Sequence, residues 1–138
     1  MRNRSCSSIL GVFFLTIAVS AATVPESPVA DAAMRSDIET MRNLLYQGAD
    51  VNAAQGDGMT ALHWAAVNGQ PEMSEMLLYA GASTEATTRM GAYTPLHLAS
   101  REGHAGVVQS LLAAGSDPNQ KTSTGGVAAL HFAAASGD

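Results

Sequence analysis

A segment of 24 residues, from Thr60 to Ser83, recurs with the same pattern of key residues from Thr94 to Asp117. The two strings are TALHWAAVNGQPEMSEMLLYAGAS and TPLHLASREGHAGVVQSLLAAGSD, and equivalent residues lie 34 positions apart. Self-similarity at one fixed period of this length is the signature of an array of copies of a single structural unit. One such unit is too small to bury its own apolar side chains, so the copies must pack against one another. The repeat therefore restricts the fold to a stacked array.

Each copy has the pattern of two short helices followed by an extended loop. In the third copy, Thr94-Pro95 places an N-cap residue before a proline that suits the first helical position, and Gly115 supplies the left-handed residue that ends the second helix. The second helix of each copy carries an apolar stripe at helical spacing: Met41, Leu44 and Leu45; Met73, Met76 and Leu77; Val107, Val108, Leu111 and Leu112. We expect these stripes to form the core of the array.

The repeats span residues 27–138, with units at 27–59, 60–93 and 94–127 and a partial fourth unit at 128–138. The fourth unit, VAALHFAAASGD, contains only a first helix, and Ala128-Ala129 replaces the Thr-Pro start. Arrays of this kind normally end in a polar cap. We therefore expect Leu130 and Phe132 to lack a covering neighbour, and the natural chain to continue beyond residue 138.

Residues 1–22 have the layout of a secretory signal peptide, which is followed by a short lead-in at 23–26. Arg2 and Arg4 form a basic start, Ile9 to Val19 is apolar apart from a glycine and a threonine, and Ser20 to Ala22 are small. The alternatives are a retained anchor and a buried helix, but 11 residues cover only about half of the roughly 20 that span a bilayer. This pattern predicts a secreted or periplasmic protein with no membrane attachment after cleavage.

Charge and cysteine content limit the functions open to the exported chain. The only cysteine, Cys6, lies within the predicted signal, so the mature chain has no disulfide. Loss of Arg2 and Arg4 reduces the 7 basic residues to 5, which face 12 acidic ones, for a formal charge of −7. Five dispersed basic residues do not form a nucleic-acid surface. The acidic residues either form a solvated face or attract a basic partner.

Three histidines recur in register, at His63, His97 and His131. Equivalent positions on stacked helices are about 8 to 10 Å apart, whereas each imidazole on a zinc ion lies about 2 Å from the metal. The histidines are therefore expected to tie helix starts to neighbouring backbone. The Gly125-Gly126 pair is read as a hairpin tip, because it lacks the lysine and the strand of a phosphate-binding loop. The sequence predicts no catalytic, cofactor or metal site, and hence no enzyme.

The chain resembles the ankyrin-repeat family. Residues 94–97 read Thr-Pro-Leu-His and are followed by Ala99, which is the complete signature; residues 60–63 lack only the proline. The resemblance implies an all-α ankyrin-repeat solenoid of stacked helix-turn-helix units with projecting hairpin loops. The export signal and the string GADVNAAQGDGMTALHWAA also resemble a group of exported bacterial ankyrin-repeat proteins.

Members of this family bind other proteins with the loop tips and the exposed side of the first helices, which implies a monomeric, non-catalytic scaffold with a protein partner. The candidate contact residues at these positions are Asp57, Met59, Val67, Asn68, Arg89, Met90, Tyr93, Arg101 and Glu102. Met90 and Tyr93 are the leading candidates because aromatic and apolar groups anchor interfaces; alternatively, they pack on their own hairpin. Two other functions stay open: a periplasmic inhibitor or immunity protein for one enzyme, and the targeting module of an enzyme whose catalytic part lies beyond residue 138.

Overall fold

The computed structural model describes residues 27–137, so the predicted signal peptide and lead-in lie outside the described residues. This part of the chain contains seven helices and no strand. The helices are α1 (Pro28–Met34), α2 (Ile38–Tyr46), α3 (Ala61–Asn68), α4 (Pro71–Tyr79), α5 (Pro95–Arg101), α6 (Ala105–Ala113) and α7 (Ala129–Ser136).

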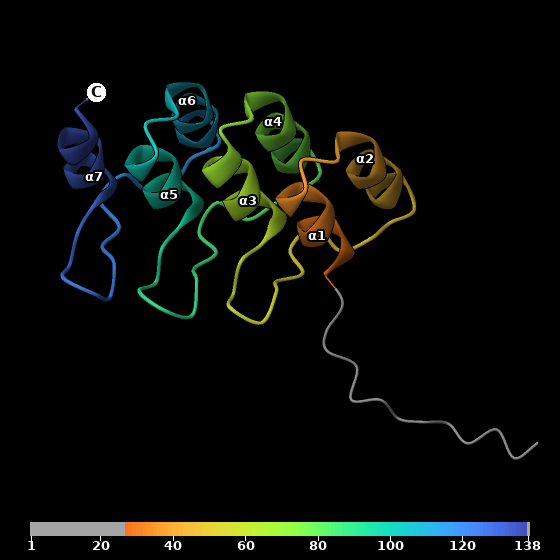
Figure 1. Cartoon of the computed structure of the whole chain (residues 1–138), viewed down its shortest axis with the longest axis horizontal. Coiled ribbons are helices and arrows are strands. Elements are labelled where there is room, and N and C mark those ends of the chain that lie inside the picture. Colours follow the sequence, from red (N-terminus) through yellow and green to blue (C-terminus); the bar gives the residue numbers. More distant parts are fainter. Residues whose placement is uncertain (1–26, 138) are drawn as a thin grey trace, which may run out of the picture.

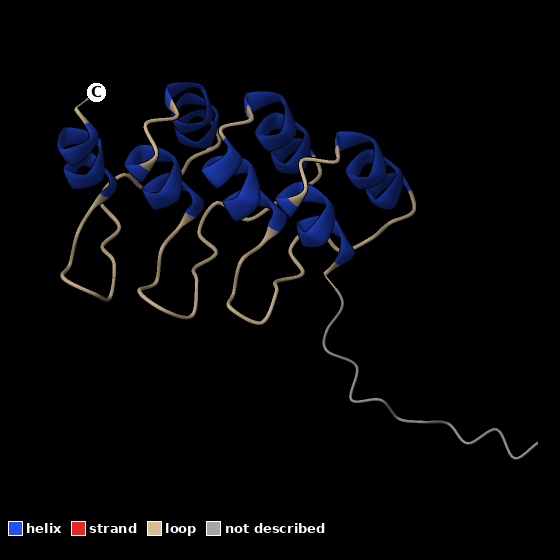
Figure 2. Ribbon diagram, viewed as in Figure 1, coloured by secondary structure: helices blue, strands red, loops and turns tan. Residues whose placement is uncertain are grey.

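The helices form two parallel rows, as Figure 1 shows. The first helices of the units, α1, α3, α5 and α7, pack side by side in one row, and α2, α4 and α6 form the row behind them. Figure 2 shows three long loops that leave the first row and project away from both layers of helices. This arrangement is the all-α solenoid with projecting hairpins that the repeat predicts.

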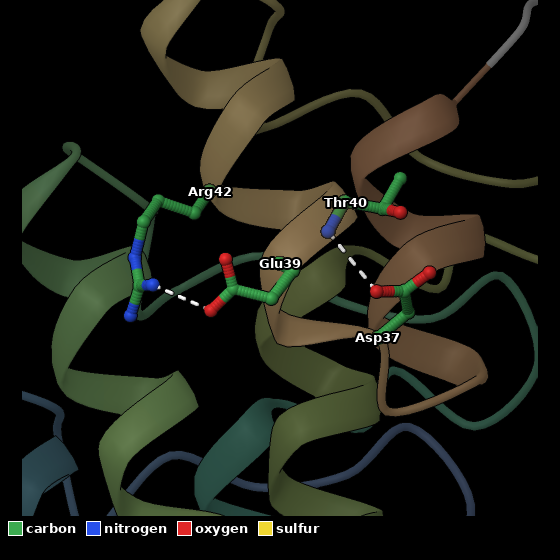
Figure 3. A network of polar contacts seen from close by, with 4 residues as sticks. All are labelled: Asp37, Glu39, Thr40 and Arg42. Carbon is green, nitrogen blue, oxygen red and sulfur yellow. Dashed lines mark hydrogen bonds and ion pairs between the residues drawn. The ribbon is translucent and has the colours of Figure 1, made fainter.

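Local sequence explains where the helices begin. Proline stands at the start of α1, α4 and α5, where its missing N–H costs nothing. Helix α2 is instead capped by Asp37, whose carboxylate accepts a hydrogen bond of 3.0 Å from the backbone N–H of Thr40 (Figure 3). Hydrogen bonds from Thr40 hold the pKa of Asp37 below its usual value. One turn on, Arg42 pairs with Glu39 at 2.6 Å, an exposed pair of the kind that adds little stability.

The core is narrower than the apolar stripes predict. Val107 and Leu111 of α6 are fully buried, Val108 is half-buried, and Leu112 is 44% exposed. Residues four apart share one helix face, whereas the following residue is turned by about 100°, so only Val107 and Leu111 point squarely into the array. Leu112 instead lines a hollow of about 140 Å³ beside α7. The expectation that Leu112 belongs to the core is therefore wrong.

Candidate functional site

A groove of about 530 Å³ lies between the projecting hairpins and the first helices of the second and third units. We call it the hairpin groove. Seven of the nine candidate contact residues line it: Asp57, Met59, Val67, Arg89, Met90, Tyr93 and Arg101. They come from two hairpins and from α3 and α5, which are separated by about one repeat in the sequence. Packing of adjacent units therefore gathers these residues on a single surface.

One wall of the hairpin groove is formed where the hairpin that carries Asp57 and Gly58 approaches the next hairpin at Arg89. The carboxylate of Asp57 accepts a hydrogen bond of 2.9 Å from the N–H of Met59, which closes its own turn. The intervening Gly58 has a φ of +86°, and a Cβ at this position would lie 2.8 Å from the amide nitrogen of Arg89. Glycine is needed here both for its backbone angle and for this close approach.

Tyr93 is held in place by its surroundings. Its backbone carbonyl accepts hydrogen bonds from Nε2 of His63 at 3.0 Å and from the N–H of Thr88 at 3.0 Å. Its half-buried ring lies 6.0 Å from the ring of Phe132, and the guanidinium carbon of Arg101 lies 5.9 Å from the ring centre, a distance suited to a cation–π contact. Tyr93 thus forms a pre-ordered wall of the groove.

Met90 differs from Tyr93 because its side chain is 86% exposed. It stands at the tip of the hairpin, where its backbone carbonyl accepts a hydrogen bond of 2.8 Å from the hydroxyl of Thr88. The tip is thus ordered while the thioether remains free to reach a neighbour. Methionine is suited to such contacts because its flexible, polarizable side chain adapts to irregular surfaces.

Asn68 and Glu102 do not line the groove. The amide of Asn68 donates to the carbonyl of Ala33 at 3.1 Å and to the hydroxyl of Ser36 at 3.2 Å, which ties α3 to the end of α1. Glu102 pairs with the neighbouring Arg101 at 2.9 Å. Asn68 thus joins two adjacent units, and Glu102 neutralises the charge of Arg101 at the edge of the groove.

Trp64 and Leu98 line the groove but are absent from the candidate set. Both occupy the position between the histidine and the alanine of the signature, where the three copies carry Trp64, Leu98 and Phe132. The flanking histidine and alanine are the same in all three copies, so variation at this position is the signal that could have identified it. The indole N–H of Trp64 donates to the side-chain oxygen of Gln55 at 2.8 Å, which orients the ring.

The repeated histidines support the backbone, as predicted. Nδ1 of His63 accepts the N–H of Thr60 at 3.1 Å, and the equivalent bonds at His97 and His131 are 3.0 Å and 3.2 Å. Nε2 of His97 reaches the carbonyl of Gln120 at 2.8 Å. Burial lowers the pKa of His63, although the carbonyl of Tyr93 acts in the opposite direction. Because both ring nitrogens of His63 are already bonded, this histidine has none to offer a substrate.

The groove combines an apolar floor with charges at its rim. Met59, Trp64 and Leu98 are half-buried or buried, whereas Asp57 and Arg89 are exposed. Within residues 27–137, no three histidine, cysteine or acidic side chains are grouped so as to hold a metal ion. None of the helices in this range has the length and apolar character needed to cross a membrane. An apolar floor with a polar rim is the layout of a protein-binding surface.

Stacked units that present such a surface define a repeat-type binding scaffold. The chain belongs to the ankyrin-repeat family: the family model for ankyrin repeats in three copies matches residues 29–122.

The curated relatives share parts of the array. Human protein phosphatase 1 regulatory subunit 27 is 33% identical over 85 residues, which is 59% of this chain and 55% of that protein. The potassium channel AKT1 of Oryza sativa subsp. indica is 41% identical over 64 residues, 46% of this chain and 7% of the channel. The palmitoyltransferase akr1 of Schizosaccharomyces pombe is 43% identical over 56 residues, 40% of this chain and 9% of the enzyme. The chain thus spans little more than half of the first of these proteins and under a tenth of the other two.

Proposed function

We propose that this chain is an exported, non-catalytic ankyrin-repeat module that binds a protein partner through the hairpin groove. One observation carries the proposal: seven candidate residues chosen from separate loops and helices line a single groove of about 530 Å³. Its apolar floor suits the side chains of a folded or extended protein segment, and Asp57 and Arg89 at the rim give that segment an orientation.

The relatives support a protein partner. One of them is named as a regulatory subunit of a protein phosphatase, and its likeness to this chain favours a role in binding. Export rests on the pattern of residues 1–22, with its basic start and apolar run.

Affinity purification with matched variants tests the groove. Arg89→Ala and Met90→Ala remove exposed groups from its rim, so they should abolish recovery of a stoichiometric partner without unfolding the chain. Tyr79→Ala is the control, because Tyr79 is 97% exposed on α4, in the other row of helices. Loss of the partner with Tyr79→Ala but not with the groove variants would refute the proposal.

The identity of the captured partner separates the more specific functions. A single enzyme whose activity falls when the chain binds would make the protein an inhibitor or immunity protein. Recovery of the chain as part of a longer protein with a catalytic domain would make it a targeting module. A partner that fits neither case leaves the general scaffold as the function.

A further inference from the structure

The methionines of the described residues differ widely in exposure. Met90 is 86% exposed and Met34 is 43% exposed, whereas Met41 and Met73 are completely buried. The other two methionines of residues 27–137, Met59 and Met76, are half-buried. An oxidant must reach the thioether sulfur to convert it to a sulfoxide, and no cysteine thiol in this range competes for the oxidant. Met90 is therefore the methionine most open to oxidation.

The hairpin that carries Met90 does not need a methionine for its own structure. The hydroxyl of Thr88 donates to the carbonyl of Met90 at 2.8 Å, and one repeat later the hydroxyl of Thr122 donates to the carbonyl of Thr124 at 2.9 Å. The same bond therefore closes both hairpins, with a methionine at one tip and a polar residue at the other. The side chain at position 90 can become polar without loss of the hairpin.

The surroundings of Met90 give such a change a consequence for binding. Met90 lines the hairpin groove together with the half-buried Trp64 and Tyr93. Oxidation replaces a flexible apolar thioether by a polar sulfoxide. A partner that covers this oxygen removes it from water, which is unfavourable unless the partner donates a hydrogen bond to it. A surface that fits the thioether is thus a poor fit for the sulfoxide.

We propose that Met90 is a site of reversible oxidation that lowers the affinity of the hairpin groove for its protein partner; this rests on the binding function proposed above. The oxidant is a peroxide. A lone pair of the Met90 sulfur attacks one peroxide oxygen, the O–O bond breaks, an S–O bond forms, and the second oxygen leaves as water. The sulfur loses two electrons and the peroxide gains them. Methionine sulfoxide reductases reverse the step: the oxygen leaves as water while two thiols become a disulfide.

The fold confines this chemistry to the surface. Met41 and Met73 belong to the core, where a sulfoxide would disrupt packing, but their complete burial keeps peroxide away from them. Oxidation at Met90 alone should therefore alter the groove and leave the helices intact.

Peptide mapping by mass spectrometry tests the selectivity. The folded protein is treated with dilute hydrogen peroxide, and the sulfoxide at each methionine is followed over time. Met90 should react at least about tenfold faster than Met41 and Met73, and the difference should disappear in guanidinium, which removes the shielding by the fold. Equal rates in the folded protein, or a faster reaction at Met34 than at Met90, would overturn the proposal.

Binding of the captured partner tests the effect on the groove. The protein is oxidised and freed of peroxide before the partner is added. Oxidation should weaken binding by about tenfold or more, with unchanged far-UV circular dichroism, and treatment with the reductases should restore it. Met90→Leu has no sulfur at this position, so its affinity should be the same before and after peroxide. Met34→Leu is the matched control, because Met34 ends α1 and lies outside the groove; this variant should remain sensitive to peroxide.

The results separate this inference from the binding function. A partner that binds the protein equally well after complete oxidation of Met90 overturns the inference and leaves the binding function in place. The same holds if Met90→Leu loses binding on oxidation, or if the helices unfold. If the untreated protein captures no partner, the binding function fails and this inference fails with it.

Discussion

The backbone N–H of Arg89 donates a hydrogen bond of 2.9 Å to the carbonyl of Asp57 and so joins two successive hairpins. The same link recurs one unit further on, where the N–H of Ser123 donates to the carbonyl of Gly91 at 2.9 Å. Each hairpin is therefore placed by its neighbour as well as by the helices beneath it. The shape of the hairpin groove depends on this contact.

Gly58→Ala should disrupt the first of these links. The substitution forces a left-handed backbone angle on alanine, which costs about 1–2 kcal/mol, and its Cβ meets the amide of Arg89 at 2.8 Å. We expect a lower urea midpoint and weaker partner binding. Gly56→Ala is the control in the same hairpin, because a Cβ there meets nothing within 4 Å; equal losses from both variants would contradict this account.

Leu111→Ala should lower the free energy of unfolding by about 2 to 5 kcal/mol, as expected for a large-to-small change in a core. Leu111 is fully buried, whereas the adjacent Leu112 is 44% exposed. Leu112→Ala should therefore cost clearly less in the same guanidinium titration. If the two substitutions cost the same, the core does not follow the narrow stripe described above.

His63 should make stability depend on pH. Burial lowers its folded-state pKa below the ordinary value of 6.5, so below about pH 6.5 the unfolded chain binds a proton that the folded chain does not. The free energy of unfolding should fall as the pH drops through this range and be unaffected by His63 above it. Urea titrations of the unaltered protein and of His63→Gln check this between pH 7.5 and 5. Their difference should shrink towards pH 5, and a constant difference would contradict the assignment.

Ala128→Thr should stabilise α7 by supplying the hydroxyl that its start lacks. At the equivalent position of α5, the hydroxyl of Thr94 accepts the N–H of His97 at 3.3 Å, and such a cap is worth about 0.5–2 kcal/mol. Hydrogen exchange of the α7 amides should slow. Ala134→Thr, in the interior of the same helix, should not slow it, because threonine there is a poorer helix former than alanine.

Export can be checked from the mature N-terminus. Mass spectrometry of the protein secreted by a bacterial host should find a chain that begins at Ala22 or Thr23, after loss of the small residues that end the predicted signal. A Phe13→Asp variant places a charge in the apolar run and should stay uncleaved. An intact Met1 on the unaltered chain in a membrane fraction would reject the cleaved signal.

Sequence reasoning predicts this fold well because the information is local and repeated. Proline starts α1, α4 and α5, and a left-handed glycine follows every described helix except α1. His63 and His97 have the same role because they lie in the same register. The hairpin groove is only partly predicted. The helical pattern predicts that Asn68 is exposed, but its side-chain amide donates a hydrogen bond to the carbonyl of Ala33, 35 residues away. No local pattern in the sequence indicates such a distant partner.

The contacts of the described array join neighbouring units, as the link between Arg89 and Asp57 joins neighbouring hairpins. In the described array, the helices of each unit pack mainly within that unit and against the adjacent units, as is usual for solenoids. Folding can therefore start at any pair of adjacent units and spread in either direction, without closing long loops of chain. Helix α3 has neighbours on both sides, α1 and α5, so the part of the hairpin groove that it forms should open rarely. The ring of Tyr93 lies against Phe132 of α7, so this wall of the groove should loosen whenever α7 opens.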